Sequence, residues 1–206
     1  MADKIKGITL ITPEFRTSYL TVFEPRLNKL SNKVEYSVQM IFDLPAKGQP
    51  NPLAEIQTAI AELKKRKFPD GKLPPNFNGP LRTDNPNNRP ELVGKCYANA
   101  KCDDKYKPGV ASPHADPKTG KVMVLNDPAA FKSGDFAMAK INAYVWHHPS
   151  GKWGVSFGLI SIQKRRDGDP LGANHSVEND YEAVAEAPGQ VSSAEVDDAL
   201  AGLNGQ

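Results

Sequence analysis

Two segments of the chain carry cations, amides and aromatic rings at every second position. The residues between them are small or apolar, as a strand with one buried face requires. The groups concerned are Lys95, Tyr97, Asn99 and Lys101 in the first segment and Lys140, Asn142, Tyr144 and Trp146 in the second. Lysines neutralise phosphates, and flat rings stack on exposed bases. If both segments belong to one sheet, the pattern predicts a surface for single-stranded nucleic acid. The alternative is that these rings only pack against the rest of the protein.

Other residues are predicted to extend this surface. Residues 68–90 contain six prolines and are predicted to form a flexible flap that carries Phe77, Arg82 and Arg89. Tyr106 stands between two lysines, and Arg16 and Tyr19 lie near the start of a predicted strand. Trp153 and Phe157, in contrast, share a face with apolar neighbours and are assigned to packing in the core or in a dimer.

Signatures of an enzyme are weak in this sequence. The four histidines and two cysteines show no familiar metal-ligand spacing, and no phosphate-binding loop or nucleophile motif occurs. Asp103-Asp104 and Asp167/Asp169 are acid pairs that leave a magnesium-dependent nuclease open as a rival hypothesis. We therefore expect a protein that is not an enzyme and that needs no metal and no cofactor.

The elements that must position these groups are mostly strands. Further strands are expected at Ile5–Thr12, Tyr19–Phe23, Val34–Asp43, Glu91–Cys102 and Val122–Asn126, and a long hairpin at 135–147 and 152–164. One helix is expected after Asn51, with Pro52 in its first position and Lys64–Lys67 in its last turn. One helix among six to eight strands predicts an all-β barrel with an inserted helix.

The chain divides sharply by charge. Residues 1–166 carry 26 lysines and arginines and 15 acidic side chains, a formal +11, whereas residues 167–206 carry nine acids and no lysine or arginine. The low content of large apolar residues predicts a disordered acidic tail at 173–206 behind a folded domain at 1–172. Ser192 and Glu195 match a capping box for a short helix that forms on binding a partner.

Composition also indicates the compartment. No stretch approaches the roughly 20 apolar residues of a membrane span. Cys96 and Cys102 are expected to be reduced. A cytoplasmic protein is therefore predicted.

In one region the sequence resembles the OB-fold single-stranded DNA-binding proteins encoded by bacteriophages. The residues that carry the resemblance are Gly134-Asp135-Phe136 to Ala143-Tyr144, Gly151–Ser156, Leu159–Lys164 and Asp167–Gly172. The resemblance implies a five-stranded OB-fold barrel with extended hairpins, which coats single strands in replication and recombination in the host cytoplasm. It also implies that the acidic tail recruits replication or recombination proteins and competes with DNA. Tails of this family often end in an aromatic residue, whereas this chain ends Gly202-Leu203-Asn204-Gly205-Gln206. Docking is therefore expected through Val196, Leu200 and Leu203 instead.

The sequence thus predicts binding to single-stranded DNA without sequence specificity, with the tail modulating that binding. It leaves open whether double-stranded DNA also binds and whether the protein is a homodimer. The alternative function is a protein-interaction adaptor, such as a recombination mediator or inhibitor, that acts mainly through the tail.

Overall fold

The computed structural model describes residues 6–29, 31–85 and 87–171. These residues fall within one compact unit, Met1–Gly172. The predictions for the acidic tail, including its disorder and the capping box at Ser192 and Glu195, lie outside the described residues.

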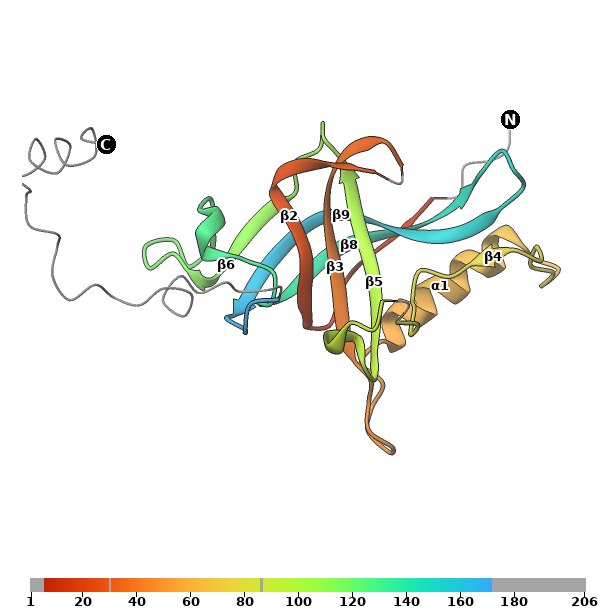
Figure 1. Cartoon of the computed structure of the whole chain (residues 1–206), viewed down its shortest axis with the longest axis horizontal. Coiled ribbons are helices and arrows are strands. Elements are labelled where there is room, and N and C mark those ends of the chain that lie inside the picture. Colours follow the sequence, from red (N-terminus) through yellow and green to blue (C-terminus); the bar gives the residue numbers. More distant parts are fainter. Residues whose placement is uncertain (1–5, 30, 86, 172–206) are drawn as a thin grey trace, which may run out of the picture. The chain divides into compact units, whose positions relative to one another are not determined.

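Five strands close into a barrel. They are β2 (Phe15–Asn28), β3 (Lys33–Asp43), β5 (Lys95–Asp103), β8 (Phe136–His147) and β9 (Trp153–Arg166). Around the ring the order is β2, β3, β5, β9 and β8, and a β8–β2 pairing closes it (Figure 1). All of these pairs are antiparallel except β5–β9. A five-stranded barrel of this kind is an OB-fold, so the predicted fold class is confirmed.

Four shorter strands attach to the barrel. β1 (Ile8–Ile11) pairs with β8, and β4 (Phe77–Asn78) pairs with β9. β6 (Gly109–Ala115) lies between β9 and β7 (Val122–Val124). The sequence did not predict β6, because Gly109, Pro113 and small residues hide any strand pattern. Its strand geometry comes from the parallel pairing with β9.

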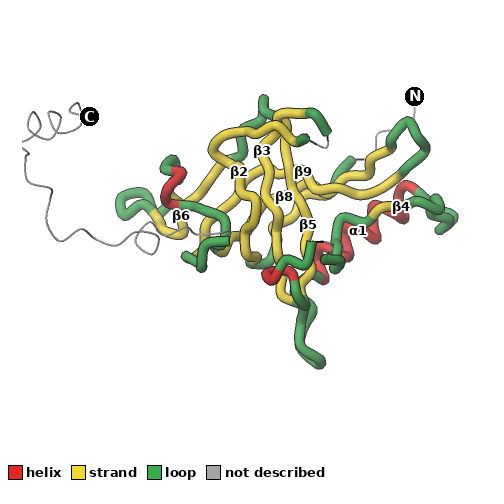
Figure 2. Tube along the Cα trace, viewed as in Figure 1, coloured by secondary structure: helices red, strands yellow, loops and turns green. Residues whose placement is uncertain are grey.

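Helix α1 (Ala54–Lys67) is the inserted helix. It buries Ile56, Ala59, Ile60 and Leu63 in the hydrophobic core. It lies on the side of the barrel where the β8–β9 hairpin extends outward (Figure 2). The Asn51 side-chain oxygen accepts a hydrogen bond from the Leu53 amide at 2.9 Å. The helix itself begins at Ala54, so Pro52 precedes it instead of filling its first position. Within the described part, no helix has the length and apolar character that a membrane crossing needs.

The barrel interior follows the predicted alternation. Val38, Met40 and Phe42 of β3 are buried, as are Cys96, Ala98 and Ala100 of β5. Ala137, Ala139, Ile141 and Ala143 fill the same core from β8, and Phe157 from β9. The core assignment of Phe157 is therefore confirmed.

Gly134, Asp135 and Gly168 fasten the end of β9 to the start of β8. The fully buried Asp135 carboxylate accepts hydrogen bonds from the amides of Lys132 (3.0 Å) and Gly168 (3.1 Å). It also pairs with Lys164 at 3.1 Å. Burial lowers the pKa of Lys164, but the carboxylates of Asp167 and Asp135 outweigh it, so the pKa is raised overall. Lys164 therefore stays charged at neutral pH. The motif that carried the family resemblance is thus a structural fastening of the barrel.

Candidate nucleic-acid interface

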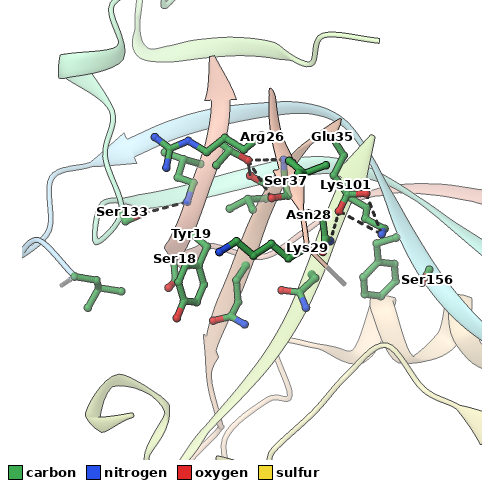
Figure 3. A pocket seen from close by; sticks show the side chains of 18 of the residues that line it. Ser18, Tyr19, Arg26, Asn28, Lys29, Glu35, Ser37, Lys101, Ser133 and Ser156 are labelled. Carbon is green, nitrogen blue, oxygen red and sulfur yellow. Dashed lines mark hydrogen bonds and ion pairs between the residues drawn. The ribbon is translucent and has the colours of Figure 1, made fainter. Parts of the chain in front are cut away.

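A groove of about 1160 Å³ lies over the outer faces of β2, β3 and β5 (Figure 3). The strand register builds its floor, because Ser37 of β3 lies opposite Lys101 of β5 and Gln39 lies opposite Asn99. Its polar and aromatic lining residues include Ser18, Tyr19, Arg26, Asn28, Lys29, Glu35, Ser37, Gln39, Arg89, Glu91, Asn99, Lys101, Ser133 and Ser156.

Tyr19 is the aromatic ring that faces this groove with most of its surface exposed. Its φ of 47° is in the left-handed region, and the β2–β3 register shifts between Ser18 and Thr21. Such an irregularity re-aims a side chain out of the regular strand pattern. The side chain is 63% exposed as a result. A bulky residue held in this backbone region costs roughly 1–3 kcal/mol and is characteristic of functional sites.

Arg89 holds the Tyr19 ring from one side. Its guanidinium carbon lies 4.8 Å from the ring centroid. The same group donates to the Ser18 hydroxyl at 2.9 Å and to the Gln39 side-chain oxygen at 2.7 Å, and it pairs with Glu91 at 2.6 Å. All three guanidinium nitrogens are thus engaged within the protein. Arg89 was predicted to contact nucleic acid from a flexible flap; the structure anchors it by these contacts, and it lines the groove.

Glu91 remains ionised beside Arg89. Burial acts to raise its pKa, but hydrogen bonds from its own backbone amide and from Arg89, with the charges of Arg89 and Arg16, lower it overall. The Arg89–Glu91 pair is therefore a neutral unit at neutral pH.

Of the four β5 residues predicted to bind nucleic acid, two line the groove and two do not. Asn99 and Lys101 line the groove, and Lys101 pairs with Glu35 at 3.1 Å. Lys95 instead pairs with Asp43 at the far end of the strand. The prediction of an exposed ring at Tyr97 is wrong.

Tyr97 is only 6% exposed because chain segments distant in sequence cover it. It packs with Ile41 and Leu92, and its hydroxyl donates to Asp84 at 3.2 Å. Its backbone also exchanges two hydrogen bonds with Arg82, at 2.8 and 2.9 Å. The second half of the predicted flap is therefore tied to β5, and the exposed Arg82 side chain lies beside that strand.

The predicted residues of β8 join the same outer surface through β9. Lys101 of β5 is paired with Gly158 of β9, which is paired with Asn142 of β8. In the next row, the groove residue Ser156 is paired with Tyr144. The two segments therefore belong to one sheet, as the pattern required.

Trp146 ends this surface on the β8–β9 hairpin. It lies over Gly154, where an added Cβ would be 2.6 Å from the indole ring and 2.7 Å from the Asn78 carbonyl oxygen. Only glycine leaves room for the indole there. Trp146 is half-buried, whereas Lys140, farther along β8, is exposed beside β1.

Phe77 and Tyr106 lie away from the groove lining. Phe77 makes an edge contact with Phe68 at 6.0 Å, and the Lys64 ammonium lies 5.1 Å from its ring. Phe68 also contacts Trp153 at 5.7 Å, so Phe77 belongs to the packing between α1 and the β8–β9 hairpin. Tyr106 is 72% exposed in the turn after β5.

Arg26 and Lys29 are groove residues that sequence reasoning missed. They lie at the end of β2 and in the turn that follows it, and both are exposed. A strand that curls over a groove leaves no local sequence signal, although the cations of 26–33 mark the turn as basic. Among residues 6–29, 31–85 and 87–171, no cluster of three His, Cys, Asp or Glu side chains could hold a metal ion.

Comparison with protein families shows to which family the chain belongs. The family model for the single-stranded DNA-binding protein of Enterobacter phage Enc34 matches residues 8–191. The chain belongs to this family. The resemblance seen in the sequence is thereby confirmed.

Solved structures of other phage proteins have the same fold as this chain. The C-terminally truncated single-stranded DNA-binding protein of phage Enc34 is 18% identical with a TM-score of 0.59, and the match covers 82% of this chain and 95% of that chain. Its complex with single-stranded DNA is 19% identical with a TM-score of 0.59, covering 83% and 97%. The single-stranded DNA-binding protein gp2.5 of bacteriophage T7 is 15% identical with a TM-score of 0.54, covering 88% and 99%. No curated protein matches the sequence.

Proposed function

We propose that this chain binds single-stranded DNA in the groove over β2, β3 and β5, without sequence specificity. The observation that carries the proposal is the exposed Tyr19 ring, held by Arg89 in a groove that the Asn99 side chain also lines. Stacking on such a ring is worth roughly 1–3 kcal/mol per base and tolerates every base. The chain acts by coating single strands during phage replication or recombination in the host cytoplasm, and it catalyses no reaction.

Membership of the Enc34 family supports this function, as does the solved complex of the Enc34 protein with single-stranded DNA. The outer surface of β9 and β8 supports a longer path, because Tyr144 and Trp146 continue the groove in the sheet register. We assign Asn99, Lys101, Asn142 and Tyr144 to this path together with Tyr19, Arg26 and Lys29.

The first test is a titration of the full chain with a fluorescent oligo-dT over a range of salt concentrations. Each phosphate contact contributes about −0.7 to the slope of log K against log salt, so two to four contacts give a slope of about −1.5 to −3. A slope near zero would refute phosphate binding, and absence of binding would refute the proposed function.

We extend the proposal to the tail at 173–206, which carries seven acids and no lysine or arginine. A tethered anion has a high effective concentration near a basic groove and competes with phosphate. The chain cut after Gly172 is therefore expected to bind oligo-dT roughly tenfold more tightly at low salt, with the gain fading as salt screens the tail. Equal affinities of the two forms would rule out competition and leave recruitment of replication or recombination proteins as the role of the tail.

A further inference from the structure

The cations that line the groove form two groups with different surroundings. Lys101 and Arg89 lie on the floor, and each is paired with a carboxylate of the same floor. Arg26 and Lys29 lie on the β2–β3 hairpin, and neither makes an ion pair within the part of the chain that the structure describes. We name Arg26 and Lys29 the hairpin cations. Among the described cations that line the groove, only the hairpin cations can bind phosphate without first breaking an ion pair.

Glu35 neutralises Lys101. Its side chain is 9% exposed and lies 3.1 Å from the lysine ammonium. Its carboxylate also accepts a hydrogen bond from the side-chain amide of Asn28 at 2.5 Å (Figure 3). Moving the lysine away would leave a nearly buried carboxylate without its cation, which opposes the separation. Lys101 is therefore held by Glu35 and is not free to follow a phosphate.

Glu91 neutralises Arg89 in the same way. The two side chains are 16% and 18% exposed and lie 2.6 Å apart. Tyr19 covers one face of the guanidinium. The floor thus presents a ring, amides and hydroxyls with almost no net charge, although it contains two cations.

A floor of this kind discriminates between the two forms of DNA. A single strand can turn its bases onto Tyr19 and the amides while its phosphates face the hairpin cations. A duplex keeps its bases stacked inside and presents phosphates, which gain nothing from a floor whose cations are already paired with carboxylates. We propose that Glu35 and Glu91 are specificity-determining residues that make the groove select single-stranded over double-stranded DNA. This inference rests on the proposed function of the groove.

The test compares the full chain with Glu35→Gln, Glu91→Gln and the double variant. Each is titrated with a mixed-sequence oligonucleotide and with the duplex of the same sequence. Glu62→Gln is the matched control. The substitution removes the same charge, but Glu62 pairs with Arg66 on the exposed surface of α1. Melting temperatures show whether each variant is folded, and Glu35→Gln alone carries the test if the double variant is not.

The unchanged chain is expected to bind the single strand about a hundredfold more tightly than the duplex, since stacking of one or two bases supplies roughly 3 kcal/mol. The double variant is expected to bind the duplex about tenfold more tightly than Glu62→Gln does, with a salt slope steeper by about 1.8 for two released cations. Affinity for the single strand should change much less.

Two results would overturn the inference: duplex affinity and salt slope equal to those of Glu62→Gln, or an unchanged chain that binds both forms equally. If the unchanged chain fails to bind the single strand at all, the proposed function falls with it. Binding to the single strand with unaltered selectivity in the variants refutes the role of the carboxylates alone.

Discussion

Replacing Gly134 by alanine is expected to lower the free energy of unfolding by about 3 kcal/mol or more. Gly134 has a φ of +110°, which L side chains rarely adopt. A Cβ there would collide with the Asp169 carbonyl oxygen. That oxygen is fixed, because it accepts a hydrogen bond from Arg16 at 2.8 Å. Neither backbone can retreat without opening the fastening around Asp135. Chemical denaturation of the purified variant measures the loss.

Gly151→Ala is the matched control for this prediction. Gly151 also has a positive φ, +82°, but no atom lies within 4 Å of the position of its Cβ. Its substitution should cost only the backbone term, about 1–2 kcal/mol. If the two variants lose the same stability, the loss at Gly134 comes from its backbone conformation alone. The close approach of Gly134 to Asp169 then contributes nothing to stability.

Tyr19→Ala is expected to weaken binding to oligo-dT by about 2 kcal/mol, roughly thirtyfold, through loss of a stacked base. The slope of log K against log salt should stay unchanged, because a ring binds no phosphate. Tyr19→Phe keeps the ring and should retain most of the affinity. Fluorescence titrations at several salt concentrations separate this loss from an ionic one.

Tyr106→Ala provides the comparison for Tyr19. Both rings are largely exposed, at 63% and 72%, but only Tyr19 lines the groove. We expect Tyr106→Ala to bind oligo-dT as the unchanged chain does. A larger loss at Tyr106 than at Tyr19 would move the binding surface to the turn after β5.

The faces of the strands could be predicted from sequence, because alternation is a local property. Ala98 and Ala100 point into the core while Asn99 and Lys101 point outward, as predicted. Tyr97 has the same alternation, yet it is buried by Ile41 and Leu92, which the fold brings to it from other segments. Cover of this kind depends on tertiary structure and leaves no trace in a strand pattern.

The most informative groove residues depend on features that alternation does not encode. Tyr19 projects outward because of a strand irregularity and a left-handed backbone. The Glu35–Lys101 pair depends on the β3–β5 register, and the Arg89 contacts join residues 50 and 71 positions apart. The sequence therefore did not point to Glu35 or Glu91, although these two carboxylates neutralise the cations on the floor of the groove.

The most direct test of the central claim locates the DNA on the protein. The full chain is photo-crosslinked to an oligonucleotide that carries 5-iododeoxyuridine, and the modified residues are identified by mass spectrometry. Binding in the groove predicts crosslinks at Tyr19, with Tyr144 or Trp146 modified by longer strands, and none at Tyr106. Crosslinks confined to residues outside the groove and outside the outer face of β8 and β9 would contradict the account.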